Sequence, residues 1–356
     1  KDQAPLLSVQ EGEVEKPAPE AVKNETEAGT GEVSLTEAWK KGFDHPITSS
    51  PVFCGGRIFF GCRDGSLYAY SPEGEMLWHY ESGSGIGASP FCIGDKIIAA
   101  NYGGDIFCLD SGSGAKIWTF AASDRIVSSP RIRGDLVVVG TMEGNLIALG
   151  LEDGSRRWAK KIGDAVWAGA TIGKNYVIAA TTDGSLVKLD HGGKIIWTAK
   201  PGGGIRSTPA CMDGRDLVVF GTKDNYLYAY SLSDGNLMWR HLCGGEINAP
   251  PISNGSEILV GCDDGHLYAL TMSGQRKWRR SLGGTVLSRP YIKDDVVFVT
   301  SYGSKIFAID IESGDVKSAY STSSPVYSSP LVAGDRVYFG SNGGVFYSLW
   351  IHGGRG

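Results

Sequence analysis

One pattern recurs eight times along the chain, and successive copies start 39 to 42 residues apart. Each copy opens on an isoleucine or valine, and a proline follows four residues later except in the fourth copy, which has Ala170. A tryptophan stands eight residues before seven of the openings, and Ser318 replaces it before the last. The openings are Ile47, Ile86, Ile126, Val166, Ile205, Ile247, Val286 and Val326. A fixed period of this length, filled with short β patterns and turn residues, is typical of a β-propeller.

Each copy predicts one blade of four antiparallel strands. In the first copy the expected strands are residues 47–53, 57–62, 66–71 and 75–81. Glycine-containing pairs separate them, and such pairs favour tight hairpins because glycine tolerates positive φ. The 51 glycines among 356 residues are therefore expected at turns and do not indicate a ligand site.

The phase of the repeat predicts how the ring closes. Trp39 precedes the first full copy, and the last copy ends soon after Leu349 without a tryptophan of its own. Residues 33–41 can therefore supply the outer strand of the last blade and leave no exposed strand edge. We predict an all-β fold for residues 34–352, an eight-bladed β-propeller of four-stranded antiparallel blades closed by the N-terminal strand. An open β-solenoid is the alternative, and it would not need the lone Trp39 strand.

The two ends of the chain differ in composition from the repeats. Residues 1–33 are rich in glutamate and proline and poor in apolar side chains, so we expect a disordered leader or tether that could hold the ring at a membrane. Its glutamates are Glu11, Glu13, Glu15, Glu20, Glu25, Glu27 and Glu32. Residues 353–356 are expected to form a glycine-rich tail.

The net charge and the lack of long apolar runs count against nucleic-acid binding and against a membrane-spanning segment. The formal net charge of −5 disfavours a general nucleic-acid binder, which needs a basic face. The sequence contains no run of eighteen apolar residues that could span a bilayer. The seven cysteines are spread over different strands, and their odd number favours buried, unreactive thiols over a disulfide framework.

The segment before several of the tryptophans resembles a known motif. Residues 108–118, 148–158 and 229–239 are similar to the tryptophan-docking motif A-x-D-x-x-x-G-x-x-x-W of the PQQ-like repeat propellers. The resemblance covers residues 34 to about 350 and implies that each tryptophan packs between neighbouring blades. These structural tryptophans are Trp39, Trp78, Trp118, Trp158, Trp197, Trp239 and Trp278.

Proteins with this repeat include quinoprotein dehydrogenases and non-enzymatic, BamB-like scaffolds. The dehydrogenases carry a vicinal cysteine disulfide, a carboxylate-rich calcium site and long insertions. This chain has no adjacent cysteines and no large insertion between its copies. The resemblance therefore favours the scaffolds and implies no cofactor and no enzyme activity. The alternatives are a quinone- or sugar-binding sensor or enzyme that uses the central funnel, or the accessory propeller of a larger enzyme.

The sequence contains no recognisable catalytic or metal-binding pattern. The six histidines fall in different repeat contexts, and none forms a pair at metal-ligand spacing. The run Gly202-Gly203-Gly204 precedes an expected strand, so no helix N-terminus is available there to bind phosphate. The serines of the S-S-P openings lack a nucleophile elbow and a partner histidine.

Candidate binding residues stand where the copies disagree. The residue after each opening Ile or Val varies freely, whereas the next two are mostly small. We expect the variable residues near one mouth of the channel, where aromatic and arginine side chains anchor partners. The candidates are Trp167, Arg206, Asn248 and Tyr327, with Arg125 and Arg289 beside them. The alternative is that they only plug the channel.

These observations predict a non-catalytic scaffold, a monomeric ring that binds a protein or peptide on one face. An assembly or accessory role at a membrane or in a larger complex is expected. Outside the cytoplasm is the preferred location because rings that resemble this one are commonly exported. The seven cysteines leave a cytoplasmic location open.

Overall fold

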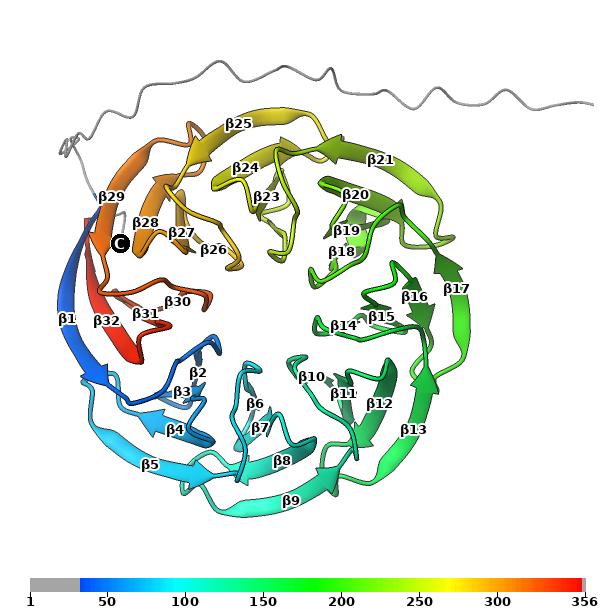
Figure 1. Cartoon of the computed structure of the whole chain (residues 1–356), viewed down its shortest axis with the longest axis horizontal. Helices are drawn as coiled ribbons and strands as arrows, with labels where there is room; N and C mark the ends of the chain where they lie inside the picture. The colour runs from blue at the N-terminus through cyan, green and yellow to red at the C-terminus, as the bar shows by residue number, and fades with distance from the viewer. Residues whose placement is uncertain (1–32, 354–356) are drawn as a thin grey trace, which may run out of the picture.

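The computed structural model describes residues 33–353, which form a closed ring of eight four-stranded antiparallel sheets (Figure 1). The predicted eight-bladed propeller is confirmed. The helical content of residues 33–353 is one 3-10 turn, Asp213–Arg215, and no helix in this range has the length and apolarity to cross a membrane. The leader at 1–32 and the end of the tail at 354–356 lie outside the described residues.

In blades 1 to 7 the strands run in chain order from the channel to the rim (Figure 1). Blades 1 to 4 consist of β2 Val52–Cys54, β3 Arg57–Gly61, β4 Ser66–Tyr70 and β5 Met76–Glu81; β6 Phe91–Ile93, β7 Lys96–Ala100, β8 Asp105–Asp110 and β9 Lys116–Ala121; β10 Arg131–Arg133, β11 Leu136–Gly140, β12 Asn145–Gly150 and β13 Arg156–Lys161; β14 Thr171–Ile172, β15 Val177–Ala180, β16 Leu186–Leu189 and β17 Ile195–Ala199. Blades 5 to 7 consist of β18 Ala210–Met212, β19 Leu217–Gly221, β20 Tyr226–Ser231 and β21 Leu237–Leu242; β22 Ile252–Ser253, β23 Glu257–Gly261, β24 His266–Thr271 and β25 Arg276–Ser281; β26 Tyr291–Lys293, β27 Val296–Ser301, β28 Lys305–Asp310 and β29 Val316–Ser321.

Blade 8 is assembled from both ends of the described chain. It contains β30 Leu331–Ala333, β31 Arg336–Gly340 and β32 Val345–His352, and its outer strand is β1 Ser34–Gly42. The β1–β32 ladder pairs Ser34 with His352 and Gly42 with Val345. Figure 1 shows the blue first strand lying along the red last one. The predicted closure by the N-terminal strand is confirmed.

The core lies between the blades. The second and third strands are buried on both faces because each sheet packs against a neighbour on either side. In the wedge between blades 1 and 2, for example, Phe59 and Leu67 pack against Ile97 and Phe107. These apolar strands therefore lack the apolar–polar alternation of a half-exposed sheet.

The S-S-P openings differ from the prediction of a strand over residues 47–53, because the structure assigns strand only to Val52–Cys54 in this segment. The hydroxyl of Ser49 accepts a hydrogen bond from the Gly61 N–H at 2.8 Å and donates one to the Gly61 carbonyl at 2.7 Å. Pro51 has no N–H to give to a ladder. A side-chain clip therefore replaces strand pairing at the start of the blade. Ser128 with Gly140 and Ser328 with Gly340 repeat this clip.

Seven tryptophans join neighbouring blades in the same way. Trp118 lies in the outer strand of blade 2. Its indole N–H donates at 2.8 Å to the Leu151 carbonyl, in the turn between the third and fourth strands of blade 3. The ring lies against Gly154, which has φ +65° and whose added Cβ would come within 2.6 Å of the indole. The other indole-to-carbonyl pairs are Trp39–Pro72, Trp78–Ser111, Trp158–His191, Trp197–Leu232, Trp239–Met272 and Trp278–Ile311.

The eighth seam, between blades 7 and 8, explains why Ser318 replaces the tryptophan. In blade 8 the third and fourth strands, β32 and β1, come from opposite ends of the described chain, so no hairpin turn joins them. The turn glycine and carbonyl that receive an indole elsewhere are therefore missing. Instead, the Leu35 N–H donates to the Ser318 hydroxyl at 3.1 Å.

Trp39 packs in the closing blade largely as the sequence suggested. Its ring centroid lies 6.1 Å from that of Tyr338 and 5.9 Å from that of Phe346. Leu349, on the same strand as Phe346, faces the other side of the sheet and packs with Leu35. Alternate strand residues point to opposite faces, which separates the two groups.

The expectation that all seven cysteines are buried thiols is wrong for two of them. Cys54 and Cys92 form a disulfide between β2 and β6, the innermost strands of blades 1 and 2. Cys54 stands three residues after Pro51, whereas Cys92 stands two residues after Pro90. Because the two cysteines are not at equivalent positions of the repeat, the repeat did not predict that they are in contact. The free thiols in the described chain are Cys62, Cys108, Cys211, Cys243 and Cys262, of which four are buried.

Candidate functional site: the channel mouth on the crossover face

One face of the ring is formed by the segments that cross from the outer strand of one blade to the innermost strand of the next. The turns between second and third strands lie on the same face, which we call the crossover face. Backbone hydrogen bonds fix the two together in every blade, as from Tyr102 N–H to the Gly85 carbonyl at 2.9 Å. The opposite, turn face carries the other hairpin turns of each blade.

A central channel of about 1240 Å³ runs between the innermost strands, and its lining extends from the crossover face to Asp213, Gly214 and Arg215 on the turn face. The variable residue of every copy lines this channel, so the structure brings the eight positions together. They are Thr48, Gly87, Val127, Trp167, Arg206, Asn248, Leu287 and Tyr327. These residues come from all eight blades and surround the end of the channel at the crossover face, which we call the mouth.

Trp167, Arg206 and Tyr327 form the centre of the mouth. The Arg206 guanidinium lies 4.8 Å from the Trp167 ring centroid, a cation–π arrangement within the usual range. Tyr327 comes from blade 8, opposite the blade of Trp167, and remains 39% exposed. Burial of the phenol, followed by the proximity of Tyr102, raises the pKa of Tyr327. The phenol therefore stays neutral and can both donate and accept a hydrogen bond.

Asn248 belongs to an acidic side of the same mouth. Its amide donates to Asp263 Oδ2 at 2.8 Å and to Glu246 Oε2 at 3.3 Å. Burial, with the nearby charge of Glu246, raises the pKa of Asp263 despite the hydrogen bond from Asn248. A cationic side chain brought to this point would favour the ionised carboxylate and offset the free-energy cost of its burial.

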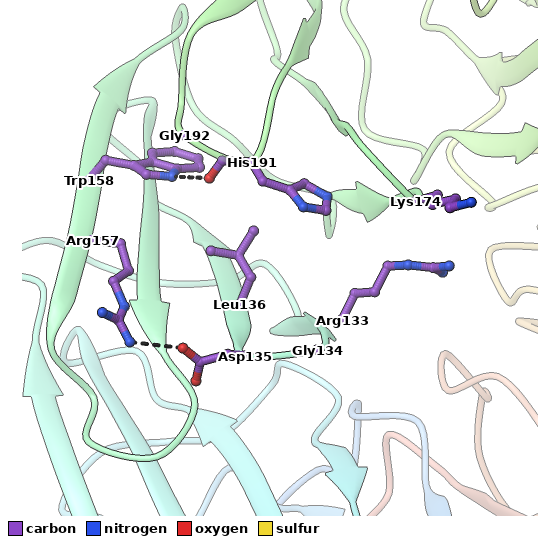
Figure 2. A pocket seen from close by; sticks show the side chains of 9 residues that line it. All are labelled: Arg133, Gly134, Asp135, Leu136, Arg157, Trp158, Lys174, His191 and Gly192. Atoms are coloured by element: carbon purple, nitrogen blue, oxygen red, sulfur yellow. Dashed lines mark hydrogen bonds and ion pairs between the residues drawn. The ribbon is translucent and has the colours of Figure 1, made fainter.

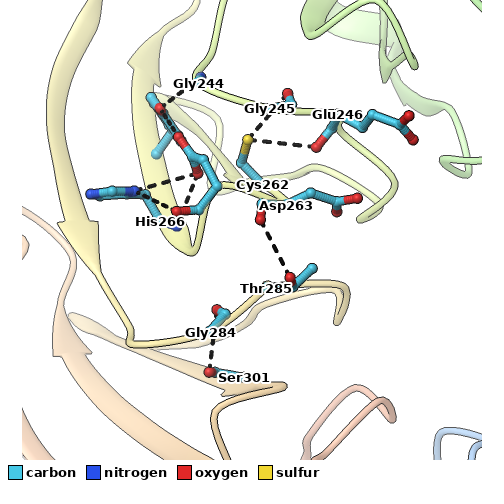
Figure 3. A network of polar contacts seen from close by, with 11 residues as sticks. Gly244, Gly245, Glu246, Cys262, Asp263, His266, Gly284, Thr285 and Ser301 are labelled. Carbon is cyan, nitrogen blue, oxygen red and sulfur yellow. Dashed lines mark hydrogen bonds and ion pairs between the residues drawn. The ribbon is translucent and has the colours of Figure 1, made fainter. Parts of the chain in front are cut away.

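A layer of polar contacts beneath the mouth holds this acidic side in place (Figure 3). The Cys262 thiol donates to the carbonyls of Gly245 and Glu246, at 3.3 and 3.5 Å. Thr285, in the crossover segment of the next blade, donates to the Asp263 carbonyl at 3.3 Å. The turn of blade 6 that carries Asp263 is therefore tied to the crossover segment that enters this blade and to the one that leaves it.

The two flanking arginines separate in the structure. Arg125 lies on the crossover face, with its guanidinium 4.8 Å from the Tyr102 ring centroid, but it is not among the residues that line the channel. Arg289 lines the channel, two positions beyond Leu287, the variable residue of its copy. That position is Ser50, Ser89, Ser129 or Ser329 in four other copies.

Sequence reasoning missed the second ring of variable residues around the mouth. These are the first residues of the turns between second and third strands, namely Arg63, Tyr102, Met142, Thr182, Lys223, Asp263, Tyr302 and Asn342. Tyr302 is 43% exposed and accepts a hydrogen bond from Asn342 at 3.1 Å. Disagreement between the copies at this second position was the signal that could have identified them.

Polar atoms without partners concentrate at the mouth. In the described chain seven buried side-chain nitrogen or oxygen atoms have no hydrogen-bond partner, and four of these belong to mouth residues. They are Arg206 Nε, Asn248 Oδ1, Asp263 Oδ1 and Asn342 Oδ1. A buried unpaired polar atom costs roughly 1–3 kcal/mol, so the mouth gains stability when water or a partner supplies the missing bonds.

A second hollow, of about 700 Å³, lies on the turn face between blades 3 and 4 (Figure 2). Arg157 donates to Asp135 at 2.8 Å at one end, and the Trp158 indole donates to the His191 carbonyl at 2.8 Å. The indole bond belongs to the seam between the two blades, whereas the Arg157–Asp135 bond lies within blade 3. Arg133 and Lys174 extend from the other side of the hollow in the same direction.

The residues present do not match a calcium-dependent quinone site. Among residues 33–353, no three His, Cys, Asp or Glu side chains come together as possible metal ligands. The disulfide joins cysteines 38 residues apart in sequence, on two blades, and is not a vicinal pair. The functional groups that do converge are those of the mouth.

The comparisons with known proteins agree with this architecture. The family model described as outer membrane protein assembly factor BamB matches residues 25–167, 163–285 and 263–355. The chain belongs to the BamB family. A search of curated proteins found no match.

Solved structures share the BamB-family fold across different functions. BamB from Moraxella catarrhalis superposes with a TM-score of 0.77 at 18% identity, over 89% of this chain and 99% of that one. A europium-containing methanol dehydrogenase gives 0.75 at 12% identity, over 89% and 93%. The quinohemoprotein alcohol dehydrogenase from Comamonas testosteroni gives 0.72 at 15% identity, over 90% and 77%. At these identities the likeness shows the fold alone.

Proposed function

We propose that this BamB-family ring is a non-catalytic scaffold that binds another protein through the crossover face. Its role would be in the assembly of outer membrane proteins or in a similar membrane-associated complex. The observation that carries the proposal is the set of unpartnered buried polar atoms among partly or fully exposed aromatic and arginine side chains at one mouth. This combination is typical of the centre of a protein interface.

The mouth also suggests what the partner presents. Trp167 and Tyr327 offer apolar surface beside the Arg206 Nε donor, and Asn248 and Asp263 offer acceptors on the adjacent wall. An extended segment with an apolar side chain, a carbonyl or carboxylate, and a lysine or arginine would satisfy all three. We therefore expect a loop or strand of a folded partner.

An extracytoplasmic location supports this role. The Cys54–Cys92 bond is of the kind that persists in oxidising compartments. Membership of the BamB family also supports a location outside the cytoplasm. Fractionation of cells that express the full chain tests this location, and recovery with cytoplasmic markers would contradict it.

The binding experiment uses the full chain and the purified soluble domains of the outer-membrane assembly machinery from the same cells. Trp167→Ala combined with Arg206→Ala should weaken the Kd by roughly 30-fold or more, since each is a hot-spot type of residue. The control is Arg133→Ala with Lys174→Ala, which changes the turn face and should bind like the wild type. Equal binding by the mouth variant and the wild type would refute this choice of face.

The same protein can be tested for the enzyme alternative. Pyrroloquinoline quinone with calcium should leave the thermal transition unchanged. A saturable rise would show binding to the native ring, because a ligand that binds only the folded state raises its stability. That result would contradict a purely non-catalytic scaffold.

A further inference from the structure

Two arginines extend into the channel below the mouth from opposite walls. Arg131 is the first residue of β10 in blade 3, and Arg289 precedes Pro290 in blade 7, so four blades separate them around a ring of eight. Both line the same central cavity. At the position of Arg131 the other copies carry Val52, Phe91, Thr171, Ala210, Ile252, Tyr291 and Leu331. The charge is therefore particular to blade 3.

Neither guanidinium forms an ion pair with another residue of 33–353. Arg131 donates to its neighbouring Pro130 carbonyl at 3.2 Å. Burial and then the positive charge of Arg289 lower the pKa of Arg131 to about 10, and burial lowers the pKa of Arg289. Both side chains are still charged at neutral pH, so two positive charges that line one cavity repel each other.

Gly169 makes room for the Arg131 side chain. A Cβ added at Gly169 would lie 3.4 Å from the Arg131 Cζ atom and 3.1 Å from the Ser129 carbonyl. The corresponding residues of blades 1, 2 and 3 are serines. The guanidinium thus occupies space along blade 4 that a side chain would otherwise fill, and it reaches toward the axis.

The channel wall adds hydroxyl donors to the two arginines. Four serines form a chain of bonds between blades, in which each Oγ accepts a backbone N–H of the preceding blade at 2.8 to 3.0 Å. They are Ser50, Ser89, Ser129 and Ser329. Because each Oγ already accepts, its own hydrogen remains to be donated, and no residue in the described part of the chain accepts it.

The charges along the channel have a positive balance. The charged residues that line it, within the described chain, are Arg131, Arg206, Arg215, Arg289 and Asp213. The single carboxylate, Asp213, already accepts a hydrogen bond from the Tyr176 hydroxyl. The chain as a whole has a net charge of −5, so this positive interior contrasts with the rest of the protein.

We propose that the central channel is a binding site for a small dianion with carboxylate or phosphate oxygens, held between the guanidiniums of Arg131 and Arg289 and the serine hydroxyls of the wall. Guanidinium groups pair with both oxyanions through two parallel hydrogen bonds. The bound dianion would neutralise two repelling charges that the protein leaves unpaired. This site lies below the protein-docking mouth and does not depend on it.

The test measures binding of succinate and of inorganic phosphate to the full chain by calorimetry and by thermal unfolding, with sodium chloride at matched ionic strength. We expect saturable binding of at least one of the two anions and a rise in Tm that chloride does not reproduce. Succinate alone would assign a carboxylate ligand, and phosphate alone a phosphate ligand. Arg131→Gln and Arg289→Gln should each weaken the Kd by roughly tenfold to a hundredfold, as loss of a charged hydrogen-bonding partner does.

Arg133→Gln is the matched control, because it removes the same charge two residues along β10 from a side chain that lines the other hollow. It should bind the anion like the wild type. The ligand-free Arg131→Gln protein should be at least as stable as the wild type, since the repulsion is removed, so lost binding would not reflect misfolding. Absence of saturable binding to the wild type, or equal weakening by Arg133→Gln, would overturn the proposal.

Discussion

The indole N–H of Trp39 donates a hydrogen bond to the carbonyl oxygen of Pro72 at 2.8 Å, and this contact joins the last blade of the ring to the first. The same indole lies against Gly74, whose added Cβ would come within 2.8 Å of it. The residue that completes blade 8 from the N-terminal strand therefore also makes the tryptophan seam to blade 1. Closure and seam depend on one short strand.

Two truncations test this dependence. A chain that lacks residues 1–30 keeps every strand of the ring and should melt like the full protein. A chain that lacks residues 1–42 loses β1 and exposes the edge of β32, so it should aggregate or unfold at much lower temperature. Loss of the Trp39 side chain alone should cost about 3 kcal/mol of unfolding free energy. Equal melting and solubility of the two truncations would disprove closure by the N-terminal strand.

The docking glycines make a second test possible. Gly154→Ala places a Cβ against Trp118 and forces a non-glycine residue to φ +65°. Gly56→Ala meets the same backbone problem at φ +75° with nothing within 4 Å, so it serves as the control. The control should cost about 1 kcal/mol from backbone conformation, and Gly154→Ala about 1–3 kcal/mol more from the collision. Chemical denaturation measures both. If both substitutions lower the free energy of unfolding by the same amount, the Trp118 indole can move away from the added Cβ at little cost.

The seam without a tryptophan predicts an asymmetry between two substitutions. Trp118→Ser should cost about 3 kcal/mol, because it empties a seam that has a receiving carbonyl and glycine. Ser318→Trp should bring no gain in Tm, since blade 8 has no hairpin turn to receive an indole. A clear stabilisation by Ser318→Trp would mean that the missing turn does not explain the serine.

Thiol chemistry checks the disulfide. In the unfolded protein without reductant, five thiols should react, because five cysteines are free. After reduction of the disulfide, seven thiols should react. In the native state Cys62 and Cys108 should be unreactive, because burial raises the pKa of each thiol to about 12. Seven thiols before reduction would show that Cys54 and Cys92 are not joined.

The carboxylate of Asp264 links stability to acid pH. Burial opposes its ionisation, but hydrogen bonds from His266 and Tyr268 prevail and lower its pKa from 3.8 to about 2. A lowered folded pKa stabilises the fold above the unfolded value, and this stabilisation is lost as pH falls from about 4 to about 2. Asp264→Asn should therefore cost roughly 1–2 kcal/mol at pH 7, and the difference from wild type should shrink across that window. Urea melts at several pH values measure it, and a difference that stays constant down to pH 2 would contradict the linkage.

The fold could be predicted from sequence because its determinants repeat. The period, the turn glycines and the early position of Trp39 each carry information that is local to one blade or common to all eight. Details that depend on side-chain hydrogen bonds were harder. The strand start at Val52 follows from the side-chain clip of Ser49 on Gly61, which alternation of residue types does not reveal.

The candidate site could be predicted in part. Comparing the copies at the position after each opening placed Trp167 and Tyr327 at the channel mouth, where the structure has them. Tyr102 and Arg131 could not be placed in the same way, because a residue in a turn or at the start of a strand is assigned to the mouth or the channel only by the curvature of the whole ring. The Cys54–Cys92 bond depends on how two neighbouring strands are staggered, and spacing along one chain does not encode it.

The pairing of Ser34 with His352 also decides how the protein can be presented to its surroundings. Both residues stand at the end of the closing blade that lies on the turn face, because β1 runs toward the crossover face and β32 away from it. The described part of the chain therefore begins and ends on the side opposite the mouth. A surface coupled directly to either of these two residues would leave the channel mouth facing outward, open to whatever diffuses past it.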